Sequence, residues 1–560
     1  MSLTSCSLFF YKEENNLKSS YTCINYTYSQ NEMDSMYNDI KKVDEYLDGI
    51  RLYNPYDFVD CCNNVFENMF LIRRYYTIEY LSYCIKGYNE NREKYLMYMD
   101  ALNDCIKFRT NLFKKAYNSK YHQNVFSDMT DEEIQELLEN HYSDKYYDLS
   151  EDQERLISEY ESLSSTEVQE LGYKYIADLI NLNTKIVNEI DNYDNYIEYE
   201  YKEAYSRNYD YNLTKNYDVY LKKYLFDYIK DIKNEYKELY DYNKLNDTKM
   251  YKVYNDFTNG ANYTFGYLTN YAKYLSDNVQ DNYEGKDFYR SYISLINSNK
   301  KLFKGTFREG AFTTLLFNYK NGDVTSQPVI YISDTYYEPS TLIHEFGHYM
   351  AYLNCGFDDI SYDLAETHSQ TDEALFWSYL YNISDLGEDA KLYRDYQLLY
   401  GLKIVILAAI VNSIEIELYE KAMNLTLTEE IIDKTIEDVL ENDYNGFDSI
   451  FDDTTLDFDI YNDDKTLKQS AVDNIKSYFK RVAVDNSLYY ISYSTSFLTT
   501  LSIYSSSLGS IDNYNVAINN YLNLLTKSGD LVDAVKDIGI TSPFDEETFI
   551  KLVGDNQNEE

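Results

Sequence analysis

Two histidines four residues apart, with a glutamate beside the first, are the residues of this sequence best suited to chemistry. His344 and His348 lie in the stretch TLIHEFGHYM, in a chain of 560 residues that has five histidines in all. On a helix, side chains four residues apart project from one face, so both imidazoles can bind one tetrahedral metal ion. Glu345 would then lie next to a metal-bound water and could take its proton. The spacing therefore predicts a zinc site that activates water.

A third metal ligand is expected from the stretch DLAETHSQTDEALFW, which follows the histidine pair. Glu366 lies 18 residues after His348, and Glu373 lies two turns after Glu366 on the same helical face. One carboxylate can bind the metal while the other accepts a hydrogen bond from a ligand imidazole. His368 points about 200° away from Glu366 by the helical period, so we interpret it as a bystander.

The elements that must position these residues are predicted to be mainly helical. Apolar residues recur at three and four positions through most of the chain, and only four prolines and 18 glycines interrupt it. The pattern changes near residue 305, where GTFREGAFTTLLF and then PVIYIS are typical of a turn and short strands. We therefore expect a mainly α fold with one small β-sheet next to the histidine helix.

Composition excludes some classes of partner. The formal net charge of −44 should repel nucleic acid and anionic membrane surfaces. The seven cysteines form no CxxC pair and are expected to be reduced and mostly buried. No stretch reaches the roughly 18 apolar residues of a membrane span, and residues 402–411 are interpreted as a buried helix segment.

The first residues leave the cellular location open between two expectations. The chain carries no full signal peptide, which favours a cytoplasmic location by default. LTSC at residues 3–6 is nevertheless similar to the end of a bacterial lipoprotein signal. If the natural chain starts further upstream, Cys6 could carry a lipid anchor at the bacterial cell surface.

The motif HEFGH, followed by Glu366, Ser369 and Glu373 in the pattern ExxSxxxE, resembles the thimet oligopeptidase and oligoendopeptidase F family of zinc peptidases. FREGAF, PVIYISDTYYEPSTLIHEFGH and the tyrosine-rich LYYISYSTSF at 488–497 are similar to further segments of that family. The similarity runs in patches from about residue 175 to the end. It implies a two-lobed helical shell around a deep substrate channel. We expect a tether or frayed segment at 1–35, an N-terminal helical lobe at 36–170 and a zinc metallopeptidase catalytic region at 171–560.

The resemblance also implies a role for each site residue. His344, His348 and Glu366 would hold one Zn²⁺ per chain, Glu345 would activate water, and Glu373 would support a ligand. Beyond these, Tyr493 and Tyr490 would stabilise the developing oxyanion, Gly310 and Ala311 would form the glycine turn that binds substrate, and Ile330 and Tyr331 would belong to an edge strand that pairs with the peptide.

One departure from the family pattern keeps a second function open. The family usually has a histidine about ten residues before the position of Tyr493, where this chain has Ala483 or Val484. The leading hypothesis is a zinc-dependent endopeptidase that hydrolyses internal bonds of short unfolded peptides. The alternative is a catalytically weak or inactive peptide-binding homologue. A purely structural helical protein with a chance motif predicts no bound metal.

Overall fold

A computed structural model describes residues 55–118, 122–126, 129–130, 134, 144–190, 194–207, 209, 211–225, 228, 257–278, 283–298, 300–320, 323–333, 339–356, 360–444, 469–484 and 486–554. The predicted tether at 1–35, the start of the predicted lobe at 36–54 and Cys6 lie outside these residues.

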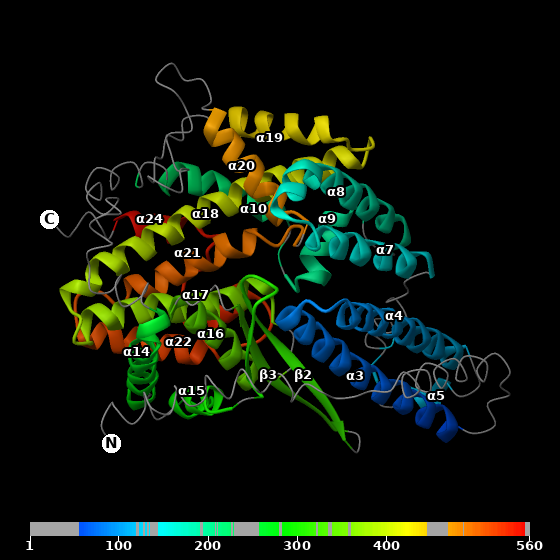
Figure 1. Cartoon of the computed structure of the whole chain (residues 1–560), viewed down its shortest axis with the longest axis horizontal. Coiled ribbons are helices and arrows are strands. Elements are labelled where there is room, and N and C mark those ends of the chain that lie inside the picture. Colours follow the sequence, from blue (N-terminus) through cyan, green and yellow to red (C-terminus); the bar gives the residue numbers. More distant parts are fainter. Residues whose placement is uncertain are drawn as a thin grey trace.

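The described part of the chain is mainly helical and contains one small sheet, as predicted (Figure 1). The helices before the sheet are α3 (Pro55–Lys86), α4 (Asn89–Tyr117), α5 (His122–Val125), α7 (Asp144–Glu161), α8 (Ser165–Ile186), η1 (Val187–Glu189), α9 (Tyr196–Tyr199), η2 (Glu200–Ala204), α10 (Tyr211–Tyr220), η3 (Leu221–Leu225), α14 (Phe257–Asp277) and α15 (Phe288–Ile296). The helices after it are α16 (Pro339–Cys355), α17 (Tyr362–Asn382), α18 (Glu388–Ala422), α19 (Glu429–Asp443), α20 (Gln469–Val482), α21 (Ile491–Ser505), α22 (Ile511–Leu524), α23 (Leu531–Asp537) and α24 (Glu546–Gly554).

The sheet has three strands in the order β1-β3-β2, and the chain enters α16 soon after it. β1 (Leu302–Gly305) pairs with β3 (Asp323–Ser333) in parallel, and β2 (Ala311–Lys320) pairs with β3 in the antiparallel direction. Ile330 therefore lies between Leu302 and Thr313, with a partner on each side. The strands β1 and β2 therefore form the two edges of the sheet, and β3 is its central strand.

This topology corrects one prediction from the sequence. Ile330 and Tyr331 were expected on an edge strand that binds the peptide, but both lie in the central strand β3 and are fully buried. The Tyr331 hydroxyl oxygen lies 2.9 Å from the Cys84 carbonyl oxygen and 2.8 Å from that of Arg308, so it can donate a hydrogen bond to either one. Because β1 and β2 pair with β3 on its two sides, the main-chain groups of Ile330 and Tyr331 belong to the interior of the sheet and cannot pair with a substrate.

Helix α17 lies at the centre of the helical layers, in contact with α16, α18, α21 and α22 (Figure 1). Ser361 caps its start by accepting a hydrogen bond from the Leu364 amide, and the side chains from Asp363 to Asp372 are all buried. The approach to α16 is unusually close. A Cβ atom at Gly347 would lie 2.7 Å from Ser369 Cα, so only glycine allows the two helices this spacing.

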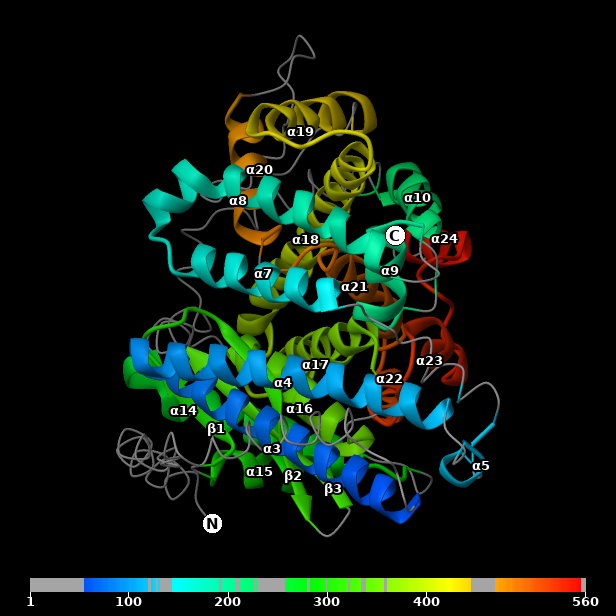
Figure 2. The ribbon, with the colours of Figure 1, turned by 90° about the vertical axis from the view of Figure 1, so that its right-hand side faces the viewer.

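Two helical hairpins flank this centre. α3 packs against α4 and against β2, while α8 packs against α7, α18, α19 and α20. In Figure 2 the α3–α4 pair extends downward from the level of α17, and the α7–α8 pair lies above it. The sheet packs directly against α16, so the α3–α4 hairpin is connected to α16 through the sheet, and the α7–α8 hairpin is connected to α17 through α18.

Helix α18 carries the apolar segment 402–411 that was predicted to be a buried helix. A window within Tyr393–Ala422 is long and apolar enough, by length and composition, to cross a membrane, but 78% of it is buried inside the protein. Val405, Ile406 and Ile410 are fully buried in the hydrophobic core. We interpret α18 as a core helix, since a helix apolar on all faces is expected at the centre of a large helical protein.

Candidate metal centre

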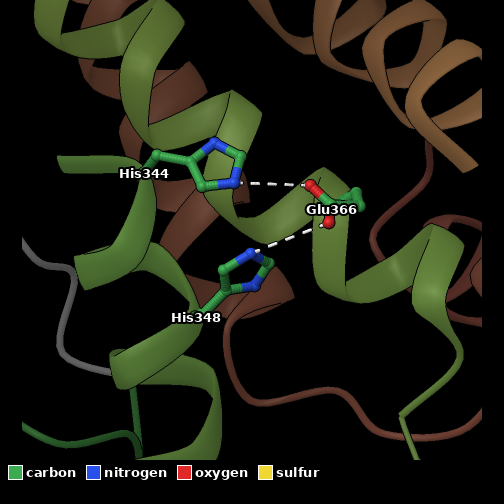
Figure 3. Close-up of side chains that lie close together, drawn as sticks. All are labelled: His344, His348 and Glu366. Carbon is green, nitrogen blue, oxygen red and sulfur yellow. Dashed lines mark ion pairs between the residues drawn. The ribbon is translucent and has the colours of Figure 1, made fainter. Parts of the chain in front are cut away.

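The two histidines of α16 and one carboxylate of α17 meet at the junction of these helices (Figure 3). The Nε2 atom of His344 lies 3.4 Å from Oε2 of Glu366, and Nε2 of His348 lies 3.9 Å from Oε1. The three ligand atoms all lie within 4.8 Å of one another. The close packing at Gly347 is what brings the carboxylate of the second helix within reach of the first.

This donor set fits a small divalent metal ion. Two imidazole nitrogens and one carboxylate oxygen are typical ligands of catalytic zinc, with bonds of about 2.0–2.2 Å. Ligand atoms around a tetrahedral ion at such distances are about 3.4 Å apart, which is close to the separations between Glu366 and the two imidazoles. With three protein ligands, a fourth position would remain for water or substrate.

Glu373 holds the first imidazole in place. Its Oε1 atom lies 2.7 Å from Nδ1 of His344, so Nδ1 donates a hydrogen bond to this carboxylate and Nε2 faces Glu366. Burial lowers the pKa of His344, but contacts with Glu366 and Glu373 outweigh it and hold that pKa well above its usual value. Burial lowers the pKa of His348 to about 4, so this ring is neutral at pH 7. The neutral ring of His348 could therefore bind a metal ion directly, whereas His344 would lose a proton when the metal binds.

Glu345 lies beside the cluster and is buried. Burial raises the pKa of its carboxyl to about 7. Thr313 of β2 donates to its carboxylate at 2.7 Å and also reaches its main-chain carbonyl at 2.9 Å. A carboxylate with a pKa near neutrality can accept a proton and release it again at physiological pH. Thr313 was not predicted from the sequence, since nothing in its own stretch marks it as a partner of α16.

Tyrosines before and within α21 lie near the carboxylate of Glu366. The Tyr489 hydroxyl donates a hydrogen bond to Oε1 of Glu366, and its oxygen lies 3.3 Å from that of Tyr493. Tyr490 is partly exposed, and its ring packs edge-on against Tyr478 at 5.6 Å. The sequence prediction named Tyr493 and Tyr490 and missed Tyr489, which makes the direct contact. Its spacing of four residues from Tyr493 is the signal that could have found it.

Other predicted residues lie at the following places. His368 points away from the cluster, with its Nε2 atom 2.9 Å from the Leu524 carbonyl. Gly310 has a positive φ of 92° and its carbonyl accepts from the Ser333 amide, while Ala311 begins β2. Ala483, where the expected family histidine is missing, is buried in the apolar core. Neither it nor its neighbour Val484 can supply a polar group to the site.

The fold and the cluster of His344, His348 and Glu366 together define a class of protein structure. In this class a mainly helical chain packs an HExxH helix against a second helix that supplies a carboxylate. A scan against models of protein families gives no match, and a search of curated protein sequences gives none. Solved structures do share the fold.

The structure of PZ peptidase A with an inhibitor superposes with a TM-score of 0.70 at 14% identity, covering 95% of this chain and 97% of that one. A candidate oligoendopeptidase F from Bacillus anthracis str. Ames gives 0.60 at 14% identity, with coverages of 95% and 97%. Oligoendopeptidase-F from Enterococcus faecium gives 0.53 at 12% identity, with coverages of 95% and 99%. The predicted resemblance to the oligoendopeptidase F type is confirmed at the level of the fold.

Proposed function

We propose that this chain is a zinc-dependent endopeptidase that hydrolyses internal bonds of short, unfolded peptides. The observation that carries the proposal is the meeting of His344, His348 and Glu366 within 4.8 Å, with Glu345 beside them. The shared fold supports it, because the structures of this fold named above include PZ peptidase A and an oligoendopeptidase-F. His344, His348 and Glu366 would hold one Zn²⁺ per chain, and Glu373 would orient His344.

Zinc bound here would polarise water and the substrate carbonyl as a Lewis acid. Glu345 would take the proton of the attacking water and later pass it to the leaving amine. Burial raises its pKa to about 7 in the metal-free site, and a bound cation would lower that pKa and favour the carboxylate that accepts the proton. The Tyr493 hydroxyl would donate a hydrogen bond to the oxyanion that develops on the substrate, and Tyr489 would hold Glu366 in position.

The substrate would bind as an added strand. Among the described strands β2 is an edge strand; its Phe317 carbonyl accepts from Arg74 of α3 at 3.1 Å, so the outer main-chain groups nearer Thr313 would pair with an extended peptide. Thr313 of this strand contacts Glu345. A peptide paired with β2 would therefore be placed in a fixed register relative to the general base. Ala311, at the start of β2, keeps its proposed role in substrate binding.

The direct test is cleavage of an internally quenched ten-residue peptide, the length of β2, by zinc-loaded protein. Glu345→Gln keeps the shape of the side chain but cannot take a proton, and should lower kcat at least about 10²-fold. Cleavage at the same rate by both proteins would refute the proposed base. Metal analysis adds an independent test: His348→Ala should abolish zinc retention, whereas His368→Ala should keep the full stoichiometry.

The alternative, a weak or inactive peptide-binding protein, is favoured by one observation. Buried Ala483 and Val484 stand where the family usually has a histidine, so one expected polar contact to the substrate is missing. Under this alternative the zinc-loaded chain binds the quenched peptide, measured by fluorescence anisotropy, but does not cleave it faster than Glu345→Gln.

A further inference from the structure

A fully buried arginine lies behind the metal centre and connects the two segments that supply Glu366 and Tyr489. Arg207 forms an ion pair with Asp363, with Nε 2.7 Å from Oδ2, and neither side chain is exposed to solvent. Asp363 lies one turn before Glu366 on α17. Tyr209 and Thr495 also donate to Asp363, at 2.9 and 2.6 Å, so the carboxylate is fully satisfied.

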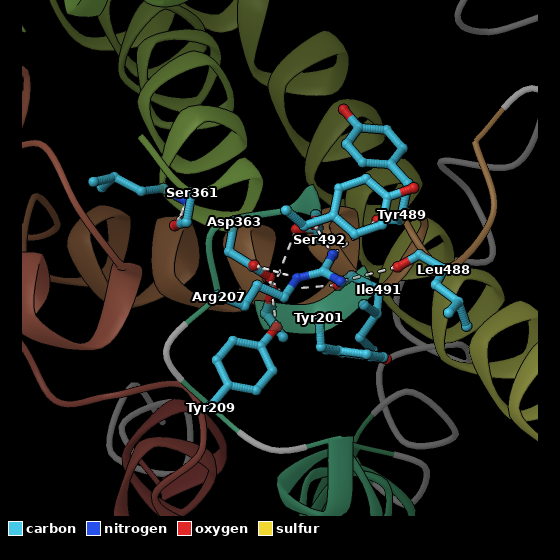
Figure 4. Close-up of polar contacts among 12 residues, drawn as sticks. Tyr201, Arg207, Tyr209, Ser361, Asp363, Leu488, Tyr489, Ile491 and Ser492 are labelled. Carbon is cyan, nitrogen blue, oxygen red and sulfur yellow. Dashed lines mark hydrogen bonds and ion pairs between the residues drawn. The ribbon is translucent and has the colours of Figure 1, made fainter. Parts of the chain in front are cut away.

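The rest of the guanidinium holds the turn that precedes α21 (Figure 4). Its Nη1 atom donates to the Leu488 carbonyl at 3.0 Å. Its Nη2 atom lies 3.4 Å from the Tyr489 carbonyl and donates to the Ser492 hydroxyl. The planar fork of arginine can make all these contacts at once, which a lysine cannot.

Leu488 has a left-handed backbone conformation, which residues other than glycine rarely adopt. Among the described residues, two that are not glycine have a positive φ: Leu488 at 58° and Ser206 at 52°. One is the residue that Arg207 binds and the other immediately precedes Arg207. Left-handed backbone at residues with a Cβ costs free energy and persists only where surrounding contacts enforce it. The two unfavourable conformations therefore lie at the two ends of the same contact.

A second buried group fixes Leu488 from its other side. The Leu488 amide donates to Oε1 of Glu415 at 2.9 Å, and this glutamate lies in the apolar helix α18. Burial raises the pKa of Glu415 to about 8, so at pH 7 it is mostly the neutral acid. Leu488 is thus held at its N–H by Glu415 and at its carbonyl by Arg207.

We propose that Arg207 and Glu415 are positioning residues that hold Leu488 in its left-handed conformation, so that Tyr489 points its hydroxyl at Glu366. With an ordinary right-handed Leu488, the chain would leave the turn in another direction and the Tyr489 ring would rotate away from the carboxylate. The role of this pair rests on the proposed function, because its purpose is to fix a metal ligand and a donor beside the reacting atoms.

The test is a double-mutant cycle between Glu415 and Tyr489. Glu415→Leu removes the acceptor for the Leu488 amide, Tyr489→Phe removes the hydroxyl, and both are combined in a third protein. Each single change should lower kcat about tenfold with KM changed by less than about twofold, because supporting contacts of a metal ligand typically act at this level. The double variant should be no slower than either single variant. Additive losses would overturn the proposal, because a general loss of stability would act independently of the Tyr489 hydroxyl.

The matched control is Glu415→Gln, whose amide oxygen can still accept from Leu488. It should restore kcat to within about threefold of the wild type, as expected for a nearly neutral group replaced by its isostere. Equal losses in Glu415→Gln and Glu415→Leu would refute the role of this hydrogen bond. If Glu415→Leu does not fold, Arg207→Lys enters the same cycle from the carbonyl side.

A second readout separates this proposal from the proposed function. If zinc-loaded wild type cleaves no faster than Glu345→Gln, the peptidase proposal fails. The double-mutant cycle between Glu415 and Tyr489 is then carried out with the zinc dissociation constant as the measured quantity in place of kcat. Glu415→Leu should weaken zinc binding about tenfold in the wild-type background and leave it unchanged in the Tyr489→Phe background. Equal weakening in both backgrounds would overturn the positioning role.

Discussion

Gly347 offers the sharpest test of how the proposed metal centre is assembled. A Cβ atom at this position would lie 2.7 Å from Ser369 Cα and 2.9 Å from the His368 carbonyl oxygen. Real Cβ contacts essentially never fall below 3.0 Å and are ordinary from 3.4 Å, so in Gly347→Ala the two helices must separate by at least 0.3 Å, and by 0.7 Å to reach an ordinary contact. Both close atoms belong to the backbone of α17, so no side-chain movement can relieve the clash.

That displacement is large for a metal site, in which distances hold to within about 0.2 Å. Glu366 lies on α17 one turn before Ser369 and would move away from the imidazoles with it. We expect the zinc dissociation constant to rise about 10- to 100-fold, or about 1.4–2.8 kcal/mol. Overpacking between the helices should also lower the free energy of unfolding by about 1–3 kcal/mol.

The assay is a zinc titration in competition with a chromophoric chelator, together with thermal unfolding of the metal-free protein. Gly266→Ala is the matched control, because this glycine also lies in a helix but a Cβ atom there would meet nothing within 4 Å. It should bind zinc like the wild type and be no less stable. A folded Gly347→Ala protein whose zinc affinity stays within about twofold of the wild type would refute the reasoning, since the structure allows the extra methyl no room.

Three further predictions concern protons at the site. Glu373→Gln cannot accept the full charge-assisted hydrogen bond of His344 and should weaken zinc binding about tenfold, measured in the same titration; unchanged affinity would contradict the supporting role. Thr313→Val removes a hydrogen bond that lowers the pKa of Glu345, so that pKa should rise and the acidic limb of kcat/KM should move to higher pH. A limb that stays in place or moves to lower pH would count against Glu345 as the base. Finally, His344 and Glu345 both carry a proton at pH 6 in the metal-free protein, so zinc binding at this pH should release at least about one proton, counted by calorimetry in buffers of different ionisation enthalpy; no release would contradict the raised pKa of His344.

The residues that short-range periodicity can place were predicted from the sequence. His344 and His348 share a helical face because they are four residues apart, and Glu366 and Glu373 share one because they are seven apart. The structure puts these two faces opposite each other. What the sequence could not provide is the distance between the helices, which depends on the close contact at Gly347.

The parts that the sequence did not provide depend on partners far away in the chain. The choice of Tyr489 over Tyr490 is determined by the left-handed turn at Leu488, whose partners are Arg207 and Glu415. No local pattern identifies such a turn at a leucine. The position of β3 in the sheet was missed for a similar reason. Its second neighbour is the four-residue strand β1, which is too short to show a strand period.

The order of the proposed zinc ligands along the chain has a consequence for how the protein folds. His344, His348 and Glu366 belong to two consecutive helices in contact, whereas Thr313 comes from the sheet and Tyr489 from a segment much later in the chain. Short-range contacts form early in folding. We therefore expect zinc to be captured by the α16–α17 hairpin before α21 docks. Pulsed hydrogen exchange with zinc present should then protect amides of α16 and α17 first, and simultaneous protection of all three helices would contradict this sequence of events.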